Sequence, residues 1–157
     1  MLKVWIVGAG GQLGTAINDV LDPLDAEVFN TDKEELDITH TDEVISFGEI
    51  NRPDVIINCA AVTDTALCEE QPELAYRVNA LGARNLSIVA RKTGAKIVQL
   101  STDDVFDGLS TTPYSEFDDT NPRTVYGRSK RAGENYVKEF THKHFIVRSN
   151  WVYGKGD

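Results

Sequence analysis

A tyrosine and a lysine in the segment TVYGRSKRAGE have the types and the spacing to act together in acid–base chemistry. Tyr126 and Lys130 are four positions apart, which places both side chains on one face of a helix. A phenol ionises near pH ~10, and a neighbouring ammonium favours the phenolate and lowers that pKa. The pair is therefore a candidate general acid for the reduction of a carbonyl group. On its own, the same spacing is also typical of a solvated helix face.

The segment QLSTDDVFDG changes from apolar residues to hydroxyls and acids at the predicted end of a strand. A calcium loop that began at Asp103 would need ligands where Val105 and Tyr114 stand, so this interpretation fails on spacing. Ligands of open α/β sheets bind at the carboxyl ends of the strands. Thr102 is therefore a candidate catalytic residue, whereas Asp103 and Asp107 are expected to serve the structure of the loop.

A glycine-rich segment, VWIVGAGGQLG, places Gly8, Gly11 and Gly14 between a predicted strand and a predicted helix. Such glycines allow a tight turn, close approach of the backbone to a pyrophosphate and close helix packing, while the helix N-terminus attracts the phosphates. Asp32 ends the second predicted strand, where an acid can hydrogen-bond an adenosine ribose. The spacing is GxxGxxG instead of a strict GxGxxG, and a bare structural turn is the alternative. The pattern predicts binding of NADH or NADPH.

Two neighbouring residues leave the choice between these cofactors open. Asp32 would repel the 2′-phosphate of NADPH, whereas Lys33 could attract it. The segment LDIT follows where an adenine could lie, although a helix cap would also explain it. The segment NCAA has small residues that suit a cofactor lying across the strand tips, or that pack against a helix. The expected cofactor-binding residues are Gly8, Gly11, Gln12, Leu13, Asp32, Lys33, Asp37, Ile38, Cys59, Ala60, Ala61 and Lys130.

Short apolar, β-branched runs alternate with helical patterns along the chain. The expected strands, nearly continuous in apolar residues as in a sheet buried on both faces, are 3–7, 26–31, 54–61, 95–101 and 144–149. The expected helices are 12–21, 41–51, 72–92 and 124–140. This alternation predicts an α/β fold, a doubly wound and Rossmann-like parallel sheet of about five strands with helices on both faces. The long segment from about 103 to 123 is expected to be a functional loop.

The composition narrows the classes of protein further. The chain has 157 residues, of which 41% are hydrophobic and 26% are charged, and its formal net charge is −9. The length suits one domain with a substantial core, and the acidic balance argues against nucleic-acid binding. No apolar run has the length of a membrane span or the form of a signal peptide, and the cysteines and histidines show no metal-ligand spacing. These features predict a cytoplasmic protein with no metal, membrane or nucleic-acid partner.

Taken together, these segments resemble the extended short-chain dehydrogenase/reductases, and within them most of all the dTDP-4-dehydrorhamnose reductase family. The resemblance covers essentially the whole chain and is carried by GAGGQLG, ELDIT, NCAA, PELAYRVNALGARNL, STDDVFDG, YGRSKRAGE and VRSNWVYG. The STDDVFDG block points to the reductases instead of the epimerases and dehydratases that share the glycine loop. The resemblance implies reduction by NADPH or NADH of the C4 keto group of a dTDP-4-keto-6-deoxy sugar, in dTDP-L-rhamnose biosynthesis.

The resemblance also implies roles for individual residues. Thr102 would bond the C4 oxygen of the substrate, and Tyr126 would donate the proton. Lys130 would tune the tyrosine and hold the nicotinamide ribose. The family usually has a tyrosine at the substrate where this chain has Asp104. An acid pointing inward there would repel a diphosphate unless an arginine such as Arg128 or Arg131 paired with it. The implied substrate-binding residues are Thr102, Asp104 and Tyr126.

Other positions have a structural explanation beside a functional one. Asn79 is similar to an asparagine near the family's active site, and bonding to a neighbouring loop explains it about as well. Packing at the end of the last strand explains Arg148 and Trp151 better than contact with substrate. After the third strand the family commonly reads A-x-T-x-V-D-x-x-E, whereas AVTDTALCEE has Ala66 and Leu67 in that region and lacks the aspartate.

Family members continue well past VRSNWVYG, and their C-terminal part completes the sheet and builds much of the nucleotide-sugar pocket. The resemblance therefore implies that residues 1–157 form the NAD(P)-binding Rossmann domain with the catalytic residues, without the C-terminal substrate-binding part. It implies a nucleotide-sugar substrate and makes a homodimer a candidate assembly. Two alternatives stay open. They are a nucleotide-sugar epimerase or dehydratase, and a non-catalytic cofactor-binding module resembling the regulatory subunit of methionine adenosyltransferase.

Overall fold

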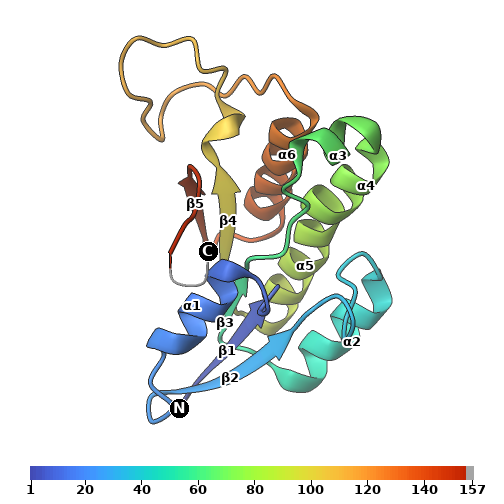
Figure 1. The fold of residues 1–157 in the computed structure, drawn as a ribbon. Coiled ribbons are helices and arrows are strands. Elements are labelled where there is room, and N and C mark those ends of the chain that lie inside the picture. The colour runs from blue at the N-terminus through green and yellow to red at the C-terminus, as the bar shows by residue number, and fades with distance from the viewer. Residues whose placement is uncertain (155–157) are drawn as a thin grey trace.

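Five parallel strands form one sheet in the order β2-β1-β3-β4-β5 in the computed structural model, which describes residues 1–154 (Figure 1). The strands are β1 (Leu2–Val7), β2 (Ala26–Thr31), β3 (Val55–Asn58), β4 (Lys96–Thr102) and β5 (His144–Ser149). Val7 at the end of β1 lies opposite Thr31 of β2 and opposite Asn58 of β3. The predicted parallel α/β sheet of five strands is confirmed.

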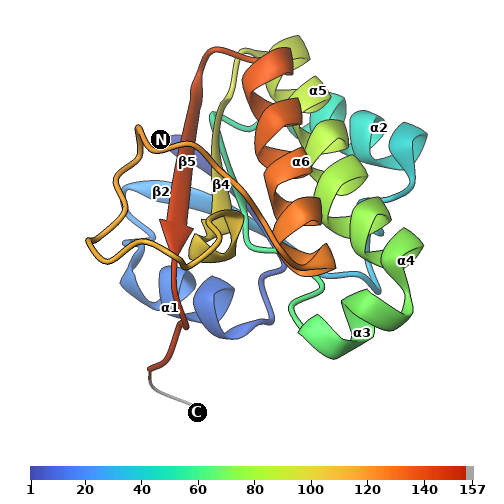
Figure 2. The ribbon, with the colours of Figure 1, turned by 90° about the horizontal axis from the view of Figure 1, so that it is seen from above.

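Helices cover both faces of this sheet. They are α1 (Gln12–Val20), α2 (Thr41–Asn51), α3 (Thr65–Glu70), α4 (Pro72–Tyr76), the π-helical η1 (Arg77–Gly82), α5 (Ala83–Thr93), the 3₁₀-helical η2 (Asp103–Val105) and α6 (Val125–Phe140). Figure 1 and the view from above in Figure 2 show α2, α5 and α6 on one face and α1 on the other. The predicted doubly wound arrangement is therefore confirmed.

Two hydrophobic cores hold these layers together, one on each face of the sheet. The larger lies under α2, α5 and α6 and comprises Trp5, Val7, Leu36, Ile38, Val44, Ile56, Ala83, Leu86, Val89, Ala90, Ala95, Ile97 and Val137. The smaller lies under α1 and comprises Val4, Ile6, Ala9 and Ala26. Burying each large apolar side chain contributes roughly 1.5–3 kcal/mol. The larger core therefore fixes the position of α6, the helix that carries the tyrosine and the lysine.

The strand order creates a crevice at the carboxyl ends of β1 and β3. From β1 the chain passes through α1 to β2 on one side, and it then returns through α2 to β3 on the other side of β1. The loops that follow β1 and β3 therefore leave the sheet in different directions. In open α/β sheets this switch point is where ligands bind.

The third strand and the third helix differ from the predicted ones. β3 ends at Asn58, earlier than predicted, because the chain leaves the sheet level with the end of β1. The predicted helix 72–92 is divided into α4, η1 and α5, and α3 was not predicted. Within η1, Asn79 accepts from the Val62 N–H at 2.9 Å and donates to the Val62 carbonyl at 3.0 Å. This tertiary contact accompanies a local widening of the helix that no helix propensity indicates.

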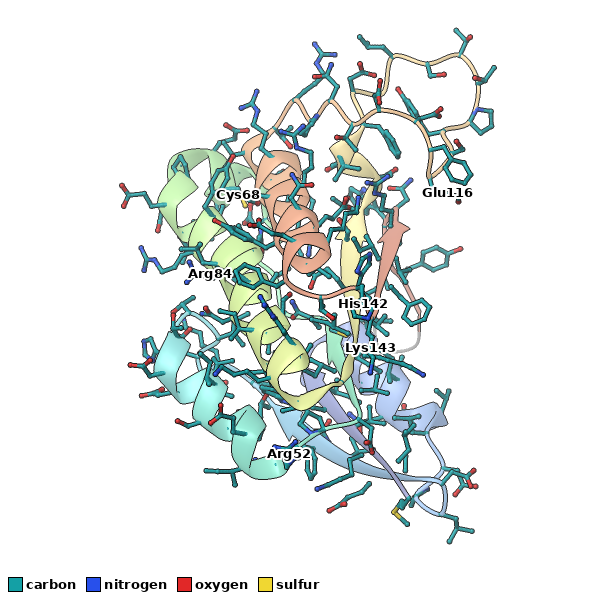
Figure 3. All side chains as sticks on the ribbon, turned by 180° about the vertical axis from the view of Figure 1, so that it is seen from behind. Arg52, Cys68, Arg84, Glu116, His142 and Lys143 are labelled. Atoms are coloured by element: carbon teal, nitrogen blue, oxygen red, sulfur yellow. The ribbon has the colours of Figure 1, made fainter. Side chains whose placement is uncertain are left out.

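The long segment between η2 and α6 is organised around one carboxylate. Asp107 accepts hydrogen bonds from the Leu109 N–H, the Tyr114 hydroxyl and the Asn121 amide, at 3.0, 2.8 and 3.1 Å. These bonds, the one from Leu109 first, lower the pKa of Asp107 to about 2. Glu116, labelled in Figure 3, lies where this loop turns back toward β5. Asp107 therefore serves the structure of the loop, as predicted.

Candidate active site

A cavity of about 350 Å³ opens at the crevice between β1 and β3. Nine predicted cofactor-binding residues line it, namely Gly8, Gly11, Asp32, Lys33, Asp37, Ile38, Cys59, Ala60 and Ala61. The predicted residues Gln12, Leu13 and Lys130 are outside this lining. Residues far apart in the sequence therefore meet in one cavity.

Seven further lining residues were not predicted. They are Val7, Thr31, Leu36, Thr39, Leu74, Arg77 and Val78. Val7 and Thr31 end β1 and β2, and Leu36 and Thr39 follow β2. The position of the crevice could have indicated these four residues. The others belong to α4 and η1, and their approach to the crevice is a tertiary contact without a local sequence signal. Arg77 among them brings a positive charge to a cavity that otherwise holds Asp32, Lys33 and Asp37 as its charged residues.

Gly8 and Gly11 differ in what surrounds them. Gly8 has a φ of 75°, and a Cβ there would lie 2.7 Å from the backbone nitrogen of Ala60, so the position requires glycine. A Cβ on Gly11 would meet only the Gly8 carbonyl oxygen, at 3.5 Å. Gly11 is also the N-cap of α1, and no side chain caps this helix. The space beside Gly11, at the positive end of α1, is therefore open to an anion.

Asp32 fastens the glycine loop to the end of β2. Both of its carboxylate oxygens accept from the Gly10 N–H at 3.0 Å. A carboxylate has about four lone-pair sites, so Asp32 can accept a further hydrogen bond without releasing the loop. Lys33 beside it is exposed and also lines the cavity. Asp32 and Lys33 therefore both line the cavity. Their charges are predicted to have opposite effects on a 2′-phosphate.

The LDIT segment forms a turn of its own before α2. Asp37 accepts from both the N–H and the hydroxyl of Thr39, at 2.9 and 2.7 Å. The N-cap of α2 is His40, whose side chain makes no capping bond, so the helix-cap explanation is wrong. The buried Ile38 is held through its carbonyl, which accepts from the Asn85 amide at 2.8 Å. The segment is thus a rigid wall of the cavity.

Tyr126 lies against the end of β4. Thr124 begins α6 as its N-cap and accepts from the Gly127 N–H at 3.0 Å. A Cβ on Gly127 would overlap the Asp104 carbonyl oxygen, so glycine lets the first turn of α6 approach η2 closely. The Thr102 side chain is near enough to the Tyr126 hydroxyl to lower the pKa of the tyrosine, and the Thr102 hydroxyl accepts from the Asp104 N–H at 3.1 Å. The candidate catalytic residues Thr102 and Tyr126 are therefore neighbours at the end of β4.

Burial raises the pKa of Tyr126 above its ordinary value, and the bond with Thr102 only partly opposes this. The charge of Asp104 raises the same pKa further. Lys130 is not among the described groups that shift it. The prediction that the ammonium lowers the pKa of Tyr126 is therefore wrong for this structure, because the ammonium is directed elsewhere.

Lys130 is buried, with 3% of its surface exposed, and its ammonium donates to the Leu100 carbonyl at 2.7 Å. Burial lowers the pKa of Lys130 to about 8, although the charge of Glu134 acts in the opposite direction. Cys59, which lines the cavity, is close enough to influence Lys130, and burial raises the pKa of its own thiol to about 11. Lys130 thus stands next to the cavity lining, on the helix face that carries Tyr126.

Asp104 stands half-buried beside Tyr126. No described residue pairs with its carboxylate, and neither Arg128 nor Arg131 neutralises it. Burial raises the pKa of Asp104, and the charge of Asp103 adds to this effect. The acid that replaces the tyrosine usual in the resembling family therefore disfavours an ionised phenol next to it.

Three residues with a structural explanation have different outcomes. Asn79 also donates to Ser129 of α6 at 3.0 Å, so it joins η1, α6 and the loop after β3 as the structural explanation predicts. Trp151 is 91% exposed, so packing does not explain it. Arg148 does more than pack, because its Nε and Nη2 donate to the two oxygens of the buried Glu134 at 2.9 and 2.6 Å.

Glu134 was missed by the sequence analysis. It follows Lys130 by four positions, as Lys130 follows Tyr126, and this repeated spacing could have indicated a third residue on the same helix face. Only the structure shows that Arg148 of β5 faces it.

The part of the chain that the structure describes has no cluster of metal-ligating side chains and no helix that could span a membrane. Between residues 1 and 154, no three His, Cys, Asp or Glu side chains are grouped so that they could hold a metal ion. Over the same range, every helix is too short or too polar to cross a membrane. Both cysteines, Cys59 and Cys68, are free thiols.

Comparison with known protein families gives one consistent result. The profile of the RmlD substrate binding domain matches residues 2–157. The dTDP-4-dehydrorhamnose reductase of Streptomyces griseus is 45% identical over 154 residues, which are 97% of this chain and 51% of that protein. The chain spans about half the length of the curated relatives it matches.

Solved structures agree with the sequence comparison. A dTDP-4-dehydrorhamnose reductase from Clostridium acetobutylicum is similar with a TM-score of 0.97 and 48% identity, over 99% of this chain and 56% of that chain. The enzyme of the same name from Bacillus anthracis, solved in complex with NADP, is similar with a TM-score of 0.97 and 44% identity, over 100% of this chain and 56% of that chain.

Proposed function

The chain belongs to the RmlD substrate binding domain family, and from that premise we propose that it binds NADPH or NADH and supplies the catalytic residues that reduce the C4 keto group of a dTDP-4-keto-6-deoxy sugar. The observation that carries the proposal is the contact between Thr102 and Tyr126 at the end of β4, with Lys130 next to the lining of the cavity. The relatives named dTDP-4-dehydrorhamnose reductase support the substrate class. On the same basis we propose a nucleotide-sugar partner, a cytoplasmic location and a homodimer.

The residues around the cavity fit a dinucleotide. The open space beside Gly11 suits a pyrophosphate at the N-terminus of α1. Asp32 and Lys33 would face the adenosine ribose, and the wall from Asp37 to Ile38 would suit an adenine. When bound, the nicotinamide supplies the hydride. The Bacillus anthracis relative solved with NADP supports this assignment.

The chain's own residues would handle the proton. The Thr102 hydroxyl would hydrogen-bond the C4 oxygen of the sugar, and the Tyr126 hydroxyl would donate its proton to that oxygen as the alkoxide forms. A raised pKa keeps Tyr126 protonated until this step. The Lys130 ammonium, one helical turn from Tyr126, would hold the nicotinamide ribose.

We further propose that residues 1–157 form the cofactor-binding and catalytic domain, and that the part of the relatives this chain does not match completes the sugar pocket. The proposal is tested in two steps. Titration of the 157-residue protein with NADPH and with NADH, followed by nicotinamide fluorescence, is expected to show saturable binding.

The second step uses a chimera in which residues 1–157 replace the matching part of the Clostridium acetobutylicum relative. It is expected to oxidise NADPH when a dTDP-4-keto-6-deoxy sugar is added. Absence of cofactor binding would refute the proposal. Binding without turnover in the chimera would favour a non-catalytic cofactor-binding module, which the unpaired Asp104 beside Tyr126 makes the second candidate.

The choice between the cofactors is expected to depend on two neighbouring charges. Asp32→Asn keeps an acceptor for the Gly10 N–H and removes the charge that would repel a 2′-phosphate. We expect it to shift the ratio of the dissociation constants toward NADPH by about tenfold, which corresponds to about 1.4 kcal/mol. Lys33→Gln is the opposite variant and should weaken NADPH while leaving NADH almost unchanged. An unchanged ratio in both variants would show that neither residue faces the adenosine ribose.

A further inference from the structure

A buried ion pair lies one helical turn beyond Lys130. Glu134 of α6 has a side chain that is 1% exposed, and the Arg148 side chain of β5 is 17% exposed. Arg148 donates from Nε and Nη2 to both carboxylate oxygens of Glu134, at 2.9 and 2.6 Å. Bidentate pairs of this kind are among the strongest and most directional contacts of a carboxylate. Glu134 therefore has a fixed orientation and both of its oxygens are engaged.

A second contact, with Phe106 directly after η2, also holds Arg148 in place. Its guanidinium lies over the Phe106 ring, 5.1 Å from the ring centroid. Phe106 in turn stacks on Tyr114, with the centroids 4.4 Å apart, and Tyr114 donates to Asp107. The organised loop and the ion pair are thus one connected structure.

Lys130 has one neighbour in this pair, Glu134, and one in the cavity lining, Cys59. Its ammonium donates to the Leu100 carbonyl of β4, although Glu134 is one turn away on the same helix face. Two titratable groups influence its pKa, namely Glu134 from α6 and Cys59 from the loop after β3. Asp103 and Asp104 of η2 act on Tyr126 instead. Burial has the largest effect on the pKa of Lys130, and Glu134 is the carboxylate that opposes it.

We propose that Glu134 and Arg148 are positioning residues for Lys130. Arg148 occupies both oxygens of Glu134, so Lys130 donates to Leu100 and stays available to a ribose hydroxyl instead of pairing with Glu134. The use of Lys130 toward the cofactor rests on the proposed function, whereas its relation to Glu134 does not. Neither residue touches the cavity described above.

The experiment follows the ionisation of Lys130 by NMR in protein with labelled lysine, without cofactor or sugar. The wild-type pKa is about 8. In Arg148→Gln, the freed carboxylate faces Lys130, and we expect the midpoint to rise by about one pH unit or more. In Glu134→Gln the anion is lost, and we expect the midpoint to fall, so that the ammonium is lost at lower pH. The double variant should lie between the two single variants.

Two further variants make the result specific. Lys138→Gln removes an exposed charge from the same helix, four positions after Glu134, and should leave the midpoint unchanged. Arg148→Lys keeps the positive charge but can cover only one carboxylate oxygen of Glu134. We therefore expect a smaller rise in the Lys130 midpoint. This variant provides the measurement if Arg148→Gln does not fold. Equal midpoints in wild type, Arg148→Lys and Glu134→Gln would overturn the inference and leave the pair a packing role. Because no cofactor is present, this outcome is independent of the proposed function.

Discussion

Replacing Tyr126 by phenylalanine is expected to lower the rate of keto-sugar reduction by roughly 10²–10⁴-fold, because the variant has no proton to donate to the C4 oxygen. The hydroxyl that is removed lies beside Thr102, and the cavity lining does not include Tyr126. NADPH affinity should therefore change little. Turnover is measured in the chimera that carries residues 1–157, and NADPH affinity in the 157-residue protein.

Tyr136→Phe is the matched control for this prediction. It makes the same chemical change on the same helix, and Tyr136 contacts Phe140 and Arg84 instead of the end of β4. Its turnover should equal that of the wild type. A Tyr126→Phe protein that loses NADPH affinity but keeps its turnover per bound cofactor would contradict the assigned role.

Asp104 bears on the role proposed for Tyr126. In this structure burial, Asp104 and Asp103 all raise the pKa of Tyr126, and the bond with Thr102 is the contact that lowers it. A phenol in these surroundings holds its proton firmly, so it suits the donation of a proton to a developing alkoxide better than the removal of one from an alcohol. The reduction direction is therefore the one that these surroundings favour.

Much of the fold could be predicted because its signals are local. The β-branched runs and the breaks between them identify each strand to within a few residues, and their alternation with helices implies a parallel sheet. The glycine segment could be interpreted for the same reason, since Gly8 and Gly11 lie within one turn between a strand and a helix. Tyr126 and Lys130 need only the period of a single helix to be placed together.

The parts that were missed depend on contacts between distant elements. Arg148 meets Glu134 only because β5 lies beside β4 and α6 packs across the sheet. Arg77 lines the cavity because η1 passes near the crevice, where Asn79 binds the loop after β3. The direction of the Lys130 ammonium depends on the Leu100 carbonyl, which no spacing in the sequence indicates.

Replacing Gly8 by alanine is expected to destabilise the protein by about 2–5 kcal/mol. A left-handed backbone costs a residue with a Cβ about 1–2 kcal/mol, and overpacking typically costs a further 1–3 kcal/mol. The new Cβ would lie 2.7–2.9 Å from backbone atoms of Cys59 and Ala60, which can move only if the loop after β3 moves. Because Gly8, Cys59 and Ala60 all line the cavity, NADPH binding should be lost as well.

Gly94→Ala separates the two contributions. Gly94 has a φ of 77°, close to that of Gly8, but nothing lies within 4 Å of the position of its Cβ. It should therefore show the backbone cost alone, about 1–2 kcal/mol, with unchanged NADPH affinity. Urea unfolding followed by circular dichroism measures both losses. Equal losses in the two variants would mean that the close approach of Gly8 to Ala60 contributes nothing, and that the crevice between β1 and β3 is looser than its geometry indicates.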